Sequence, residues 1–175
     1  MKKINLIIIL ALSIIFSFCT KKAEKRNNEI TRIVFATGGC YGHCPIQVID
    51  MDSSLKFKYQ GLEYSKYIGY YEGKINQELW DSLNIELERI NYNQLDTIYS
   101  HSVDDLSTEI YIYHKNGVKH IYAQSLSLPK NVENFYEWFL ERIQKLEMKS
   151  TNNEFNFHTT TEKPIPEPDY FEIEK

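Results

Sequence analysis

Two cysteines and a histidine lie close together in a glycine-containing stretch of this 175-residue chain. Cys40 and Cys44 are four residues apart, and His43 lies between them. A disulfide joining the two cysteines would close a small ring, which stabilises a fold by about 2 kcal/mol on the chain-entropy model. We therefore interpret the pair as a structural disulfide, and the neighbouring glycines as the source of the backbone freedom that so tight a ring needs.

The same residues suggest two other chemistries. Dithiol redox sites usually have two residues between the cysteines, at a helix N-terminus, whereas here three residues intervene and the stretch leads into a predicted strand. A metal site would use Cys40, His43 and Cys44, and would need a fourth ligand such as His101 or His120. The alternative to a disulfide is thus a thiol-redox or metal-binding site, and the preferred interpretation requires no cofactor.

The N-terminus has the pattern of an export signal. Lys2 and Lys3 precede an apolar run over 4–18, which is shorter than the roughly 20 residues of a membrane span. The run ends at Cys19 and resembles a bacterial lipoprotein signal, in which the cysteine is lipidated and becomes the new N-terminus. Residues 1–19 are therefore predicted as a signal peptide and Cys19 as the lipidation site; an ordinary cleaved signal and an uncleaved anchor are the alternatives.

These features predict a location in the cell envelope. The charged stretch 20–28 is typical of a tether to a domain at 29–147. If Cys19 carries lipid, an even pair of cysteines remains, and exported cysteine pairs tend to be oxidised. We expect an outer-membrane lipoprotein that faces the periplasm or the cell surface, or a secreted protein if Cys19 is not lipidated.

Hydrophobic periodicity predicts the elements of the domain. Strands are predicted at 30–37, 46–51, 55–59 and 64–71, followed by a helix at 76–90, two strands flanking Asn116-Gly117, and a helix after Pro129. The order ββββ-α-ββ-α predicts an α+β fold: a single antiparallel sheet of about six strands with two helices packed on one face. Residues 148–175 form a polar, proline-containing tail that we expect to be mostly disordered.

The predicted hairpin contains a candidate ligand surface. A two-residue type I′ turn at Asn116-Gly117 would place Tyr113 opposite His120 and Tyr111 opposite Tyr122. Alternation then puts these four side chains on one face and the aliphatic residues on the core face. The aromatic face suits a sugar or protein ligand; alternatively it is a second sheet face that loops partly cover.

Composition and motifs argue against several classes of function but do not identify one. The net charge of −4 and the absence of a basic run beyond the N-terminal region argue against a nucleic-acid partner. Neither a Gly-x-Ser-x-Gly motif nor a phosphate-binding loop occurs. We therefore predict no catalytic residue and prefer a non-catalytic domain with a membrane anchor and a protein or glycan partner.

Several short motifs together resemble a known family. They are Cys40-Tyr41-Gly42-His43-Cys44-Pro45, Asp52 in a turn, Lys58-Tyr59-Gln60-Gly61, Gly73 before a helix, Asp105-Leu106-Ser107-Thr108, and Asn116-Gly117. The region from Glu29 to Leu146 resembles a domain of unknown function found in exported bacterial lipoproteins, marked by Cys-x-Gly-x-Cys-Pro. The resemblance implies the location and the fold, and it implies no known activity.

Overall fold

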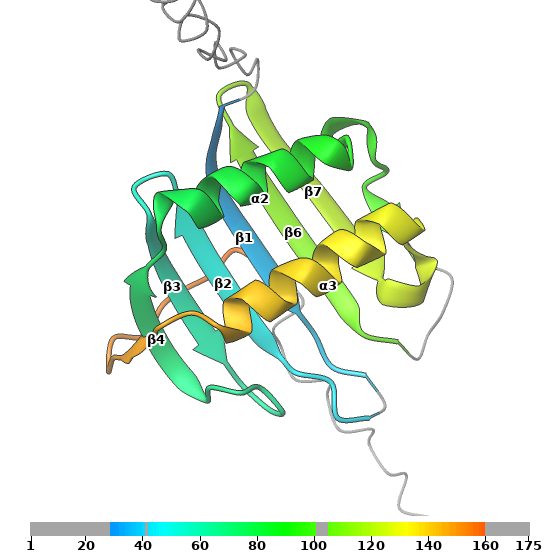
Figure 1. Ribbon diagram of the computed structural model, residues 1–175. Helices are drawn as coiled ribbons and strands as arrows, with labels where there is room; N and C mark the ends of the chain where they lie inside the picture. The colour runs from blue at the N-terminus through cyan, green and yellow to red at the C-terminus, as the bar shows by residue number, and fades with distance from the viewer. Residues whose placement is uncertain (1–28, 41, 101–104, 160–175) are drawn as a thin grey trace, which may run out of the picture.

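The computed structural model describes residues 29–40, 42–100 and 105–159, and within them the chain forms one sheet with two helices on one face (Figure 1). The predicted signal peptide 1–19, its Cys19, the tether 20–28 and His101 lie outside the described residues. The sheet order is β5-β7-β6-β1-β2-β3-β4-β8. The strand bounds are β1 Ile30–Thr37, β2 Gln47–Asp52, β3 Lys56–Gly61, β4 Gly69–Lys74, β5 Ile98–Tyr99, β6 Ser107–His114, β7 Gly117–Gln124 and β8 Lys149–Ser150.

The α+β prediction is confirmed, but the sheet differs from the predicted one in two ways. It has eight strands in the described residues rather than about six, and it is mixed, because β5 pairs parallel with β7 at one edge. The other edge gains β8 beside β4. Both additional strands are two residues long, and so short a pairing leaves no alternating pattern in the sequence.

The fourth strand also lies later than predicted. It spans Gly69–Lys74 rather than 64–71, because the chain turns at Tyr64, which has a positive φ of 58°. Gly69 begins the strand with a φ of 105°, a value that a residue without a Cβ adopts without strain.

The register of the β6–β7 hairpin is shifted from the predicted one. The loop residues are Lys115 and Asn116, with His114 opposite Gly117, so Tyr111 pairs with His120 and Tyr113 with Val118. Neither loop residue has a positive φ, whereas Gly117 has a φ of 148°; the predicted mirror-image turn at Asn116-Gly117 was therefore wrong. The partners move by two residues, and an even shift leaves every side chain on its predicted face.

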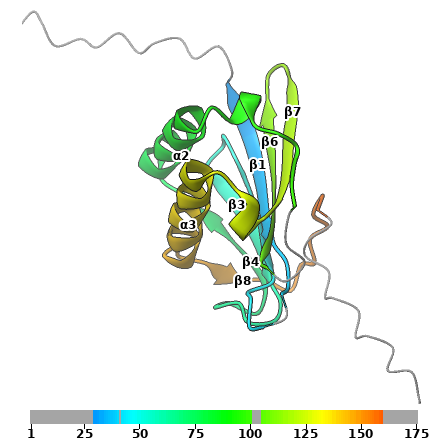
Figure 2. The ribbon, with the colours of Figure 1, turned by 90° about the vertical axis from the view of Figure 1, so that its right-hand side faces the viewer.

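Both predicted helices form and cover the same face of the sheet (Figure 2). Helix α2 (Gln77–Arg89) begins at Asn76, whose side chain accepts a hydrogen bond from the Leu79 amide at 2.8 Å, as expected of an N-cap. Helix α3 spans Lys130–Gln144. Their apolar stripes meet the sheet in one core, which includes the buried Phe35, Leu83, Leu87, Phe135 and Phe139. Among the described residues, no helix combines the length and apolar character needed to cross a membrane.

The tail begins with structure rather than disorder. Beyond α3, β8 pairs with β4, and the chain then crosses the sheet face opposite the helices up to Thr159 (Figure 2). Phe157 is buried there against Val34, Ala36 and Val48. The rest of the predicted tail, residues 160–175, lies outside the described residues.

Candidate functional site

The cysteine loop lies between β1 and β2. Cys40 and Cys44 form a disulfide with a Cα–Cα distance of 5.6 Å. The Thr37 hydroxyl donates to the carbonyl of Pro45 at 2.5 Å, across the base of the loop. The ring therefore reinforces the turn that joins two adjacent strands, as the predicted structural disulfide requires.

The loop does not bring together the alternative metal ligands. In the disulfide neither sulfur is a thiolate, which is the form that binds metals or attacks disulfides. The His43 ring packs edge-on against Tyr64 with 4.8 Å between centroids, while His120 contacts Glu109 on the sheet. No three His, Cys, Asp or Glu side chains in the described part of the chain could hold a metal ion.

The predicted aromatic surface centres on a buried carboxylate that the sequence did not single out. The side chain of Glu109 is 1% exposed. One carboxylate oxygen lies 2.8 Å from His120 Nε2 and accepts from the Tyr111 hydroxyl at 3.0 Å. The other oxygen accepts from the Thr159 hydroxyl. These bonds offset the high cost of removing a carboxylate from water, so Glu109 organises this face.

The contacts of Glu109 are those of a structural cluster rather than of a nucleophilic site. In a catalytic triad the imidazole bonds both the carboxylate and the attacking hydroxyl. Here the hydroxyls of Tyr111 and Thr159 donate to the carboxylate itself. Burial, and secondarily Glu109, raise the pKa of Tyr111 to about 12, so its hydroxyl stays protonated as a donor.

The rings of this surface are largely covered. Tyr111 stacks on His120 with 4.2 Å between centroids, and His158 lies 4.7 Å away. The Arg32 guanidinium lies 5.0 Å from the Tyr113 ring centroid. Tyr122, opposite Glu109 in the register, is half-buried. The structure thus brings Tyr111 and His120 together but leaves little free ring surface for a sugar to stack on.

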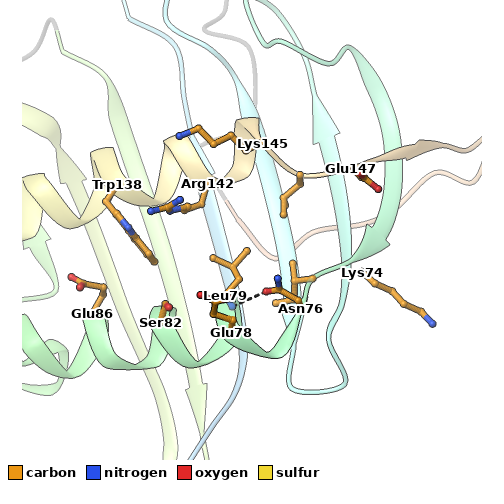
Figure 3. A pocket seen from close by; sticks show the side chains of 12 residues that line it. Lys74, Asn76, Glu78, Leu79, Ser82, Glu86, Trp138, Arg142, Lys145 and Glu147 are labelled. Carbon is orange, nitrogen blue, oxygen red and sulfur yellow. Dashed lines mark hydrogen bonds between the residues drawn. The ribbon is translucent and has the colours of Figure 1, made fainter.

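The more open site lies on the other side of the sheet, between the two helices. Helices α2 and α3 contact each other little, and a groove of about 570 Å³ runs between them. Figure 3 shows Trp138 projecting from α3 toward α2, where Ser82 and Glu86 lie, with Arg142 beside it on α3. The sequence shows each helix but not this groove, because its width depends on how far apart the helices lie.

The groove combines apolar and charged groups. Ile75, Leu79 and Leu146 contribute apolar side chains, and Trp138 is half-buried. The Arg142 guanidinium lies 5.5 Å from the Trp138 ring centroid, within the range of a cation–π contact. No ion pair between described residues includes Arg142, whereas Glu86 across the groove is paired with Arg89. The arrangement can accept a carboxylate beside an apolar group.

Comparison with known proteins identifies the domain. No curated protein sequence matches the chain significantly. A family model described as a domain of unknown function, DUF6438, matches residues 31–144. This confirms the predicted resemblance in its coarser form, while the lipoprotein character and the cysteine signature stay predictions. Because the match covers well over half of the chain, the protein belongs to the family of domains of unknown function DUF6438.

Proposed function

We propose that this protein is a non-catalytic, lipid-anchored domain of the cell envelope that binds a segment of a partner protein in the groove between α2 and α3. The observation that carries the proposal is the exposed Arg142 guanidinium, which lies over Trp138 at the groove wall without an ion-pair partner among the described residues. Arginine and tryptophan are enriched among the residues that contribute most binding energy at protein interfaces.

The groove suits a protein segment better than a sugar. A sugar ring needs an open aromatic face, and Arg142 covers one face of the Trp138 indole. A groove between two helices, lined by Leu79 and Leu146, instead accepts a peptide segment that places apolar side chains in it. The partner segment should therefore carry a carboxylate next to an aliphatic or aromatic side chain.

The strand directions agree with a membrane-tethered orientation. The tether would join the domain just before β1, which starts at Ile30 and runs to Thr37. The disulfide loop follows Thr37, and therefore lies at the opposite end of the strand. The helices cover a lateral face of the sheet (Figure 2), so an anchor at the start of β1 would leave the groove accessible.

Selection from a random-peptide display library on the purified chain tests the binding site. Peptides enriched on the native chain should bind Arg142→Glu at least about tenfold more weakly. Lys130→Glu is the matched control, because it reverses a charge on the same helix at an exposed residue, and it should bind within about twofold of native. Failure to enrich peptides, or equal binding to both variants, would refute the groove as the site.

The anchor is tested separately by the mass of the mature protein. We expect an N-terminus at Cys19 that carries a lipid, and we expect Cys19→Ala to leave the membrane fraction. A mature protein without lipid, released from membranes, would contradict the anchor while leaving the peptide measurement valid.

A further inference from the structure

The segment from Lys149 to Thr159, here called the strap, lies across the face of the sheet opposite the helices (Figure 2). It begins at β8, the edge strand that pairs with β4, and its last residue contacts Glu109 of β6. It therefore passes over β3, β2 and β1 between these two contacts. The family match ends at residue 144, before the strap begins.

Two phenylalanines two residues apart attach the strap to the sheet. The Phe155 ring packs edge-on against Tyr70 at 5.7 Å, and the Lys58 ammonium lies 5.2 Å from its centroid. Phe157 is 6% exposed and packs in the small cluster of Val34, Ala36 and Val48. Full burial of a phenylalanine is worth about 1.5–3 kcal/mol, so Phe157 is the main apolar anchor.

The end of the strap is attached by polar and ring contacts. The Thr159 hydroxyl donates to Glu109, whose side chain is almost completely buried. His158 lies over Tyr111 with 4.7 Å between ring centroids. The face therefore provides an aromatic contact one residue beyond Phe157 and a positioned acceptor two residues beyond it.

Side chains rather than backbone attach most of the strap. Lys149 and Ser150 pair with Glu72 and Tyr71, and the Thr151 amide donates to the carbonyl of Tyr70 at 3.0 Å. Beyond Thr151, no backbone hydrogen bond links the strap to the sheet within the described residues. The part of the strap beyond Thr151 can therefore detach without breaking a strand ladder, while β8 stays paired with β4.

We propose that this face is a binding site for an extended Phe-x-Phe-His-Thr segment, and that a second copy of the chain supplies this segment when the strap of the first copy detaches. The contacts of the strap define the segment that this face would bind. The face offers apolar contacts to Phe155 and Phe157 and a hydrogen-bond acceptor to Thr159. Exchange of an identical element between copies is a low-cost route to dimers. This inference does not depend on the groove between the helices.

A labelled peptide with the sequence of residues 149–159 tests the face directly. The receptor is the full chain with Phe157→Ala, whose own strap has lost its main anchor. The peptide should bind this variant saturably, and should bind the native chain at least about tenfold more weakly, because the native strap competes. A peptide carrying the same alanine should bind neither receptor.

Absence of binding to a folded Phe157→Ala chain would overturn the proposal, and so would equal binding of the native and alanine peptides. If Phe157→Ala does not fold, Thr159→Val serves as the receptor, because it keeps the phenylalanine packing and removes the hydroxyl that bonds Glu109. It should bind the peptide more tightly than native does, and binding no tighter than native would overturn the proposal.

Exchange between copies is measured with two affinity tags. A tagged Phe157→Ala chain should co-purify with an untagged native chain, which supplies an intact strap. It should recover at least about fivefold less of an untagged Phe157→Ala chain. Equal recovery of the two partners, or no recovery of native, would show that a second copy is not the occupant.

Discussion

The two faces of the sheet are covered in different ways. Helices α2 and α3 cover one face and build a large core around Phe35, Leu83 and Phe139. On the other face, the strap covers a small cluster through Phe155 and Phe157. A helix satisfies its own backbone and presents a regular apolar stripe, whereas the strap depends on single side chains. The helical face should therefore set global stability, and the strap face should control access to a surface.

The largest expected loss of stability follows a substitution on the face of the sheet that α2 and α3 cover, here called the helical face. Phe139→Ala removes a buried ring that lies 5.1 Å from Phe35 and 6.0 Å from Phe135, and should lower the free energy of unfolding by about 3–5 kcal/mol. Urea denaturation followed by circular dichroism measures it. If Phe139→Ala lowered the free energy of unfolding by less than Phe157→Ala does, the helical face would not be the one that sets global stability.

Phe157→Ala should lower the free energy of unfolding by less, about 1.5–3 kcal/mol, because its apolar cluster is small. The same urea titration applies, and the far-ultraviolet spectrum should remain native because both helices lie on the other face. Loss of helical signal with this variant would show that the two faces are not independent.

Removing the disulfide should lower the stability contributed by the two faces of the sheet equally. Replacement of Cys40 and Cys44 by serine should lower stability by about 2 kcal/mol on the chain-entropy model, because the ring joins β1 to β2, whose side chains serve both cores. In the protein with both cysteines replaced by serine, Phe139→Ala should still lower the free energy of unfolding more than Phe157→Ala does. An unchanged melting temperature would argue against the structural role.

Tyr111 allows a pH test of the strap face. Its pKa is raised to about 12 from an ordinary 10.0, so between these values the folded state keeps a proton that the unfolded chain releases. The free energy of unfolding should therefore fall as pH rises from about 10 to 12. Tyr111→Phe should cost about 1 kcal/mol at neutral pH through its lost hydrogen bond, and should show a shallower decline in that window. Parallel pH curves for the two proteins would contradict the assignment.

The smallest expected effect has the opposite sign. The Tyr136 hydroxyl is buried without a hydrogen-bond partner among the described residues, and burial raises its pKa. Tyr136→Phe should stabilise the helical face by about 1 kcal/mol, because an unsatisfied buried hydroxyl is costly. Calorimetry should show a raised melting temperature, and a clear decrease would indicate that the hydroxyl has a partner.

Regular patterns explain which parts of the fold were predictable. The apolar periodicity that includes Leu83 and Leu87 predicted α2, and β1 was predicted with its observed bounds. The hairpin register was wrong, yet the faces of Tyr111 and His120 were right, because side-chain alternation survives an even shift. Two-residue strands such as β5 and β8 have no such pattern.

The candidate sites were less predictable than the elements. Tyr111, Tyr113, His120 and Tyr122 were recognised as one face, but Glu109 on the same face was not. Phe155 and Phe157 occur in a polar stretch that composition alone assigns to a disordered tail. The groove between α2 and α3 has no sequence signal, because its residues come from separate elements.

The sequence by itself determined the helices, most strands, the face of each strand residue and the spacing that allows a small disulfide ring. These properties depend on neighbours within a few residues along the chain. Only the tertiary structure decided that the strap crosses the second face, that Glu109 is buried there, and that the helices lie far enough apart to leave a groove. Those outcomes depend on contacts between residues far apart in the chain, where packing rather than local preference decides the arrangement.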